Sequence, residues 1–342
     1  MRYRLMGQSG LRVSDICLGT MTFGDGQGWG TDAEESMALV DRFFEAGGNF
    51  VDTANKYTSG ESEKIVGRAL RGRRQRAVLA TKYSLNTDPT DPNAGGNHRK
   101  SLIHAVEASL QRLETDHIDL LWIHAWDGMS PIRGVMRALD DLVRAGKVGA
   151  IGASDTPAWL VSYANAMADA YGWTPFSALQ LQYSLVERTS ERELIPMANA
   201  LGLGVTAWSP LAGGLLTGKY SGLKADVEVP DSKRASVNGW RRTERNLTIA
   251  AAVDRAAADL GWPPAQVAVA WVLQRGALPI VGARTPAQLE DHLSAAAREL
   301  PLEVLETLDA ASAIRLGFPH DFLAWKPIVK AMFGQTRALI DA

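Results

Sequence analysis

The chain has 342 residues, of which 46% are hydrophobic and 22% are charged, and its net charge is -2. This length suits either two domains or one large α/β barrel. The near-neutral charge gives no electrostatic basis for binding nucleic acid or an anionic membrane, so we expect neither as a partner. A single cysteine, Cys17, excludes an internal disulfide, and the sequence has neither a spanning apolar run nor a secretory stretch. We therefore expect a cytoplasmic protein.

Short apolar runs alternate with helical patterns from about residue 15 to residue 298. Most of these runs are continuously apolar, which is typical of parallel strands that are covered on both faces. We expect eight such strands, at 16–19, 50–53, 78–82, 120–124, 148–153, 178–183, 204–208 and 279–282.

The segments between these runs carry apolar residues at helical spacing. One stripe runs from Ile132 to Val143, and Gly146 follows it as a stop signal. Eight strands, each followed by a helix, predict an α/β protein with a closed (β/α)₈ TIM barrel.

Two segments fall outside the eightfold repeat. Residues 1–14 indicate a β-hairpin with glycines at its turn, which we expect to cap the bottom of the barrel. Residues 299–342 indicate a C-terminal helix and tail, so the chain forms one domain over 1–342 with its barrel at 15–298. The polar region 221–243 has no clear period and predicts a long loop over the barrel mouth.

Polar side chains follow three successive predicted strands. Asp52, Lys82 and His124 stand at the strand ends, and Tyr57 follows Asp52 on the next loop. Catalytic groups of barrel enzymes gather at the C-terminal ends of strands. An ammonium beside a phenol lowers the phenol pKa from about 10, a carboxylate holds the ammonium, and a histidine can orient a carbonyl. The four residues therefore predict a general acid above an electrophilic carbon.

Each of these residues has a structural interpretation when it is taken alone. Asp52 could cap the following turn, Lys82 could be a solvated lysine, and His124 could be a satisfied histidine at a strand end. Tyr57 could be an interface aromatic. Their joint placement at neighbouring strand ends favours the catalytic interpretation.

Several motifs occur in an order that resembles the aldo-keto reductase family. Segment 52–57 reads DTANKY and is followed by GESE, and 109–113 reads SLQRL before IDLL and His124. The segments GAIGAS at 149–154 and PIVGAR at 279–284 complete the set. The resemblance covers essentially residues 1–313 and, through the WSPL segment at 208–211, extends to the potassium-channel beta subunits.

The resemblance implies hydride transfer between a nicotinamide and a small-molecule carbonyl substrate, with NADP(H) as cofactor. It implies a catalytic tetrad of Asp52, Tyr57, Lys82 and His124, in which the tyrosine supplies the proton. It also implies cofactor contacts from a larger set: Gly19, Thr20, Met21, Asp52, Ser154, Asp155, Gln180, Trp208, Ser209, Pro210, Leu211, Lys219, Gly282, Arg284, Gln288, Asp291 and His292.

The chemistry of several cofactor positions agrees with this assignment. A flat indole at Trp208 offers a stacking surface, and we expect the helix start after Gly282 to present free N–H groups to a phosphate. Arg284 could grip a 2′-phosphate, which favours NADP over NAD. Two positions depart from the common pattern, because Asp155 stands where asparagine is frequent and Asp291-His292 replaces a Glu-Asn pair.

Two other functions stay open at this point. A cofactor-binding regulatory subunit would share the barrel, and a Schiff-base aldolase would use Lys82 as its nucleophile if that lysine were free of Asp52. We expect a monomer, because no exposed apolar stripe marks the sequence. The substrate pocket is expected to involve Met21, Trp29, Tyr83, Trp126 and the 221–243 region, with Phe318 or Phe322 added from the C-terminal tail.

Overall fold

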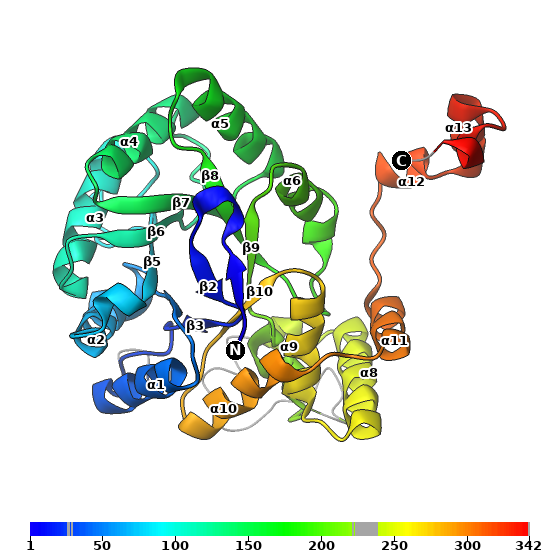
Figure 1. Cartoon of the computed structure of the whole chain (residues 1–342), viewed down its shortest axis with the longest axis horizontal. Coiled ribbons are helices and arrows are strands. Elements are labelled where there is room, and N and C mark those ends of the chain that lie inside the picture. Colours follow the sequence, from blue (N-terminus) through cyan, green and yellow to red (C-terminus); the bar gives the residue numbers. More distant parts are fainter. Residues whose placement is uncertain (26–27, 29, 221, 223–238, 341–342) are drawn as a thin grey trace.

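The structure is a computed structural model that describes residues 1–25, 28, 30–220, 222 and 239–340. Eight parallel strands close into a barrel in the order β10-β3-β4-β5-β6-β7-β8-β9, with helices outside it (Figure 1). This confirms the predicted TIM barrel. The strands are β3 (Cys17–Gly19), β4 (Phe50–Asp52), β5 (Val78–Tyr83), β6 (Ile118–Ile123), β7 (Val148–Ser154), β8 (Phe176–Gln182), β9 (Gly204–Trp208) and β10 (Leu278–Val281).

The helices follow the strands and bury their apolar stripes against them. In α4 the stripe includes Val135, Leu139 and Leu142, all of which are buried. The helices of the barrel and its C-terminal side are α1 (Ala33–Glu45), α2 (Glu61–Ala69), α3 (Arg99–Leu113), α4 (Ile132–Arg144), α5 (Ala158–Tyr171), α6 (Leu194–Ala200), α8 (Glu244–Leu260), α9 (Pro264–Gln274), α10 (Pro286–Ser294) and α11 (Leu302–Ser312). None of the described helices is long and apolar enough to cross a membrane.

A β-hairpin closes the bottom of the barrel, as the sequence predicts. Strands β1 (Tyr3–Leu5) and β2 (Arg12–Ser14) pair antiparallel around a short 3₁₀ turn. Gly7 in this turn has φ 53°, and a Cβ there would lie 2.1 Å from the carbonyl oxygen of Ser177. Because Ser177 lies near the start of β8, this contact holds the turn against the N-terminal ends of the strands.

The inside of the barrel is filled by apolar side chains below the strand ends. Phe50, Leu120 and Trp122 pack there with Cys17 and Met6, and all five are fully buried. Lys82 and Tyr83 show the alternation of a strand, since Lys82 bonds to Asp52 within the barrel while Tyr83 packs in the outer core. Because the lower half of the barrel is filled, a ligand cavity inside the barrel can form only near the C-terminal ends of the strands.

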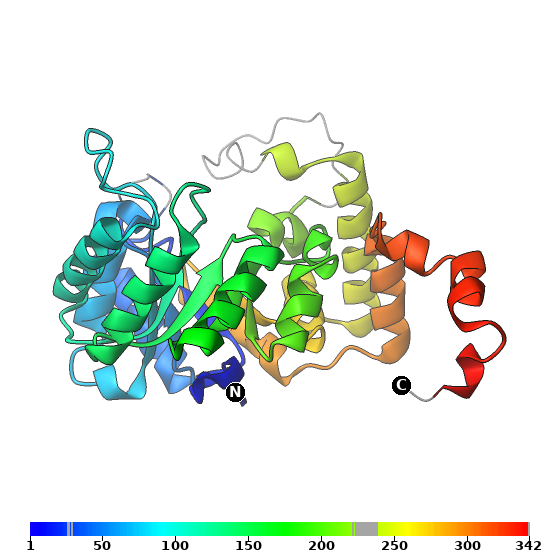
Figure 2. The same ribbon diagram turned by 90° about the horizontal axis from the view of Figure 1, so that it is seen from above.

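The C-terminal extension leaves the barrel after α11. Helices α12 (His320–Leu323) and α13 (Lys326–Phe333) lie beyond α11, and α13 lies apart from the barrel in both views (Figures 1 and 2). The sequence predicts a helix and tail here, but not that the tail stands away from the body.

Candidate active site

Four predicted residues meet at the C-terminal ends of β4, β5 and β6. Asp52 is the last residue of β4, Lys82 is the next-to-last of β5, and His124 follows β6 directly. The strands are parallel neighbours, with Asp52 paired to Ala80 and Lys82 to Trp122, so their ends share one edge. Tyr57 begins the 3₁₀ turn Tyr57–Gly60.

The Lys82 ammonium has three N–H groups, and the structure gives each of them a partner. Nζ donates to the Asp52 carboxylate, to the carbonyl oxygen of Thr53 at 2.9 Å, and to the hydroxyl oxygen of Tyr57 at 3.1 Å. The side chains of Lys82 and Asp52 are only 1% and 2% exposed. Since Lys82 donates to Tyr57, the phenol O–H is left to donate elsewhere.

The Asp52 carboxylate is held on both oxygens. One oxygen pairs with Lys82, and the other accepts from Nε2 of Gln180 at 3.1 Å. Burial alone would lower the pKa of Lys82, but the charge of Asp52 and the bond to Tyr57 raise that pKa above its ordinary value. The lysine is therefore a fixed cation.

The pKa of Tyr57 differs from the sequence-based expectation. Burial raises the pKa of the phenol, and the opposing effect of Lys82 is not large enough to reverse it. The nearby Asp52 carboxylate also raises this pKa, because it offsets part of the ammonium charge. The expectation of a lowered pKa was wrong in direction, and Tyr57 stays protonated at neutral pH.

His124 stands beside Tyr57 as a neutral ring. The two ring centroids are 5.9 Å apart and the rings are nearly perpendicular, at 86°. Burial, with a contribution from the Lys82 charge, lowers the pKa of His124 to about 3. At neutral pH the imidazole therefore carries no charge and has one nitrogen able to donate and one able to accept.

A cavity of about 620 Å³ opens beside these residues and runs toward α10. Tyr57 and His124 line it, whereas Asp52 and Lys82 lie behind them. Most of the predicted cofactor residues also line it, namely Met21, Ser154, Asp155, Gln180, Trp208, Ser209, Pro210, Leu211, Lys219, Gly282, Arg284, Gln288, Asp291 and His292. Gly19 and Thr20 do not, and the Thr20 hydroxyl bonds to the carbonyl oxygen of Asp52 and to Ser62.

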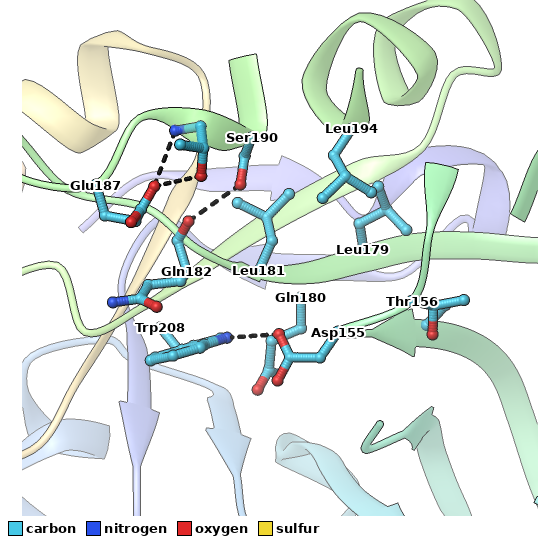
Figure 3. A pocket seen from close by; sticks show the side chains of 12 residues that line it. Asp155, Thr156, Leu179, Gln180, Leu181, Gln182, Glu187, Ser190, Leu194 and Trp208 are labelled. Carbon is cyan, nitrogen blue, oxygen red and sulfur yellow. Dashed lines mark hydrogen bonds between the residues drawn. The ribbon is translucent and has the colours of Figure 1, made fainter. Parts of the chain in front are cut away.

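Trp208 is held in place by Asp155. The indole Nε1 donates to Oδ1 of Asp155 at 3.2 Å (Figure 3). Desolvation raises the pKa of Asp155, and its φ of 43° is a left-handed conformation that aspartate tolerates better than most residues. A second cavity of about 190 Å³ shares Trp208, Asp155 and Gln180 with the large one. The carboxylate at this position therefore orients the indole.

The far end of the large cavity carries two cations. Lys219 and Arg284 line it, and neither forms a salt bridge with any carboxylate in the described part of the chain. Gly214, with φ 95°, makes room for this lysine, because a Cβ there would lie 2.7 Å from Nζ of Lys219. Two cations without carboxylate partners suit a ligand that carries phosphate groups.

The start of α10 has fewer free N–H groups than the sequence suggests. Pro286 at its first position has no N–H, and the N–H of Gln288 donates to the Thr285 hydroxyl at 3.3 Å. The Gln288 side chain in turn accepts from the backbone N–H of Arg284 at 3.0 Å. A ligand at this end would therefore meet more side-chain groups than free N–H groups of the helix terminus.

The comparisons with known proteins agree with this arrangement. The aldo/keto reductase family model matches residues 15–313. The chain belongs to the aldo/keto reductase family. It is 37% identical to a norsolorinic acid reductase of Aspergillus flavus, over 94% of this chain and 84% of that protein. It is 36% identical to an aryl-alcohol dehydrogenase of Pestalotiopsis microspora, over 96% and 91% of the two chains. The protein is an oxidoreductase of a family that generally uses nicotinamide cofactors.

Several cavity residues of this aldo/keto reductase were missed from the sequence. The missed residues are Gly213, Gly214, Thr217, Pro263, Ala265, Ile280 and Val281. The two glycines come shortly after the WSPL segment and are a recognisable turn signal. The two glycines have φ of 67° and 95°, which only glycine adopts readily. The apolar members carry no signal of their own, since they read as ordinary core residues.

Only some of the residues predicted to form the substrate pocket lie at the large cavity of the reductase. Met21 lines the large cavity, but Tyr83 is 1% exposed and directs its hydroxyl toward the carbonyl oxygen of Asn97. The assignment of Tyr83 to the pocket was wrong, because it follows Lys82 in β5 and points to the opposite face. Trp126 is half-buried against the outer core. Phe318 and Phe322 are exposed on the C-terminal tail and do not line the large cavity. Trp29 and most of the 221–243 region lie outside the described residues.

Proposed function

We propose that this protein reduces an aldehyde or ketone to an alcohol by hydride transfer from NADPH, with Tyr57 as the general acid. The observation that carries the proposal is the bond from Nζ of Lys82 to the hydroxyl oxygen of Tyr57 at 3.1 Å. Because the lysine donates in this bond, the phenol hydrogen is free to reach a carbonyl oxygen in the cavity. Asp52 and Thr53 occupy the other lysine N–H groups, so the geometry is fixed.

Each of the four side chains has a separate role in the proton transfer. Tyr57 donates its proton to the substrate oxygen as negative charge develops there, and Lys82 stabilises the phenolate that is left. Asp52 holds the ammonium in place from behind. Neutral His124 donates a hydrogen bond to the same substrate oxygen and so orients it. The nicotinamide, when bound, supplies the hydride.

The cavity residues fit a nicotinamide dinucleotide. Trp208, fixed by Asp155, offers a flat face for the nicotinamide ring, and Ser154 and Gln180 lie beside it. Lys219 would meet the pyrophosphate. Arg284, whose guanidinium forms no salt bridge with the described residues, would hold the 2′-phosphate, which favours NADPH over NADH.

We further propose that the carbonyl of the substrate is attached to an aromatic ring. The names of the relatives support this, since they describe a norsolorinic acid reductase and aryl-alcohol dehydrogenases. Met21, which is 45% exposed at the cavity edge, offers a polarizable surface that suits an aromatic ring. Aromatic aldehydes are therefore the first substrates to test.

A direct experiment is to follow NADPH absorbance with the purified protein and 4-nitrobenzaldehyde, beside a matched aliphatic aldehyde. We expect turnover, with a higher kcat/KM for the aromatic compound. Tight binding of NADPH without turnover on any aldehyde or ketone would contradict the proposal and favour the regulatory alternative. Equal kcat/KM values for both aldehydes would contradict only the aromatic preference.

The aldolase alternative requires a lysine that is free of Asp52 and easily deprotonated. Lys82 is bonded to Asp52, and its pKa is raised, not lowered. Both observations favour the reductase over Schiff-base chemistry. Borohydride trapping with an aldehyde substrate should leave Lys82 unmodified.

A further inference from the structure

The C-terminal arm, residues 314–340, exposes a run of large apolar side chains. Helices α12 and α13 and the 3₁₀ turn Arg337–Leu339 contain no buried residue. Large apolar side chains of the arm are between 36% and 85% exposed, and these are Leu316, Phe318, Phe322, Leu323, Trp325, Met332, Phe333, Leu339 and Ile340. Isolated surface residues are ordinary, but a continuous segment of this kind marks an interaction surface.

The arm is tied to its own barrel only at its base. Arg192 donates to the carbonyl oxygen of Arg315 at 2.9 Å, and His320 contacts the Glu193 carboxylate at 3.0 Å. Beyond His320, the side-chain hydrogen bonds among the described residues stay within the arm, such as that from Thr336 to the carbonyl oxygen of Phe333. Helices of four and eight residues are marginal in water without a packing partner. The arm therefore needs a surface that its own barrel does not supply.

Helix α5 offers a surface of the matching kind. Its inner face is buried, but Trp159 is 69% exposed and Tyr163 is 53% exposed on the outer face. Ala166 and Ala170 continue this exposed stripe at helical spacing. The helix has one charged residue, Asp169, in fourteen positions. Its neighbour α4 has five in thirteen, namely Arg133, Arg137, Asp140, Asp141 and Arg144.

We propose that the protein is a two-fold dimer in which the C-terminal arm of each chain packs on the α5 face of the other. Within one chain, the arm leaves beside α11 while α5 lies between α4 and α6, and the two do not meet (Figure 1). A two-fold axis places each arm on the partner's α5 and buries both apolar surfaces at once. The expectation of a monomer rested on the lack of an exposed apolar stripe in the sequence, whereas the structure exposes apolar side chains on both the arm and α5.

The area of the contact is limited by its smaller side, which is α5. With roughly 150–250 Å² on a fully exposed aromatic side chain, the exposed fractions of the arm amount to on the order of 900 Å² of apolar surface. A stable interface buries about 800 Å² on each partner. On the same scale, the exposed fractions of Trp159 and Tyr163 on α5 amount to about 250 Å². An exchanged pair therefore needs both copies of the contact, together with the alanines of the α5 stripe, to approach the area of a stable interface.

Sedimentation equilibrium of the full chain tests this proposal independently of catalysis. We expect wild type at micromolar concentration to have the mass of two chains. Trp325→Glu on the arm and Tyr163→Glu on α5 should each raise the dissociation constant at least about a hundredfold, because each places a charge in the apolar contact. Leu302→Glu is the matched control, since Leu302 is 70% exposed but lies on α11.

A cross-linking experiment identifies the partner surface directly. A chain with Tyr163→Cys is mixed with a chain that carries Met332→Cys, and the buried Cys17 does not compete for oxidation. We expect a disulfide between the two different chains. A wild-type monomer, with or without affinity for lipid vesicles, overturns the proposal, and so does a dimer that survives either glutamate substitution. Circular dichroism confirms that each variant is folded.

Discussion

The buried pair of Lys82 and Asp52 makes a prediction about stability that is separate from catalysis. Replacing the lysine in Lys82→Met leaves the buried Asp52 carboxylate, whose side chain is 2% exposed, with the Gln180 amide as its one side-chain partner among the described residues. Replacing both residues, in Lys82→Met with Asp52→Asn, removes both charges and keeps an oxygen that can accept from Gln180. The two variants therefore differ in whether a charge stays buried.

The expected sizes follow from the burial of the pair. Removing one partner of a buried ion pair costs about 3–5 kcal/mol, because the other charge is left uncompensated, so Lys82→Met should lose that much. The double variant should recover at least about 2 kcal/mol of this loss. Both should lose carbonyl reduction, because neither has a cation to stabilise the Tyr57 phenolate.

Urea unfolding at pH 7, followed by circular dichroism, measures these free energies. Lys56→Met is the control, because Lys56 is an exposed lysine that donates to the carbonyl oxygen of Asn86, and its loss should change stability by about 0.5 kcal/mol or less. A Lys82→Met protein as stable as wild type would refute the description of the buried pair. A double variant no more stable than Lys82→Met would refute the assignment of the loss to an unpaired carboxylate.

Three further predictions concern the cavity. Arg284→Ala should weaken NADPH binding by about 10–100-fold and leave NADH nearly unchanged, and equal losses in fluorescence titrations would contradict its role. Asp155→Asn should keep the melting temperature, whereas Asp155→Ala should lower it, because alanine neither accepts from Trp208 nor tolerates φ 43°. The pKa of His124 is about 3 in the folded protein and about 6.5 unfolded, so its contribution to stability is present above pH 6.5 and lost as the pH falls toward 3. Wild type should lose about 2 kcal/mol more than His124→Gln between pH 7 and pH 5, and equal losses would contradict the neutral ring.

Much of the barrel could be predicted because parallel strands have a strong signature. The expected strand at 204–208 coincides with β9, and the others differ from the structure by one or two residues at an end. The proximity of Asp52, Lys82 and His124 could be predicted for the same reason, since the C-terminal ends of parallel strands lie at one edge of the barrel. Motif order supplied the family, which the alternation alone could not.

Other features depend on distances between side chains, which a sequence pattern does not give. The direction of the Tyr57 pKa shift is set by the balance of burial against one ammonium, and that balance needs coordinates. The bond between Asp155 and Trp208 joins residues 53 positions apart in the chain. The arm reads as a tail in the sequence, because its apolar residues are not periodic enough to show which surface they leave exposed. The cytoplasmic location stays a prediction.

The most direct test of the central claim is the turnover of Tyr57→Phe. This change removes the phenol hydroxyl alone and keeps the ring that lies against His124. We expect steady-state reduction of an aromatic aldehyde to fall by about 10²–10⁴-fold, while the dissociation constant for NADPH changes by no more than about twofold. Turnover close to that of wild type, with cofactor binding intact, would contradict the assignment of Tyr57 as the proton donor.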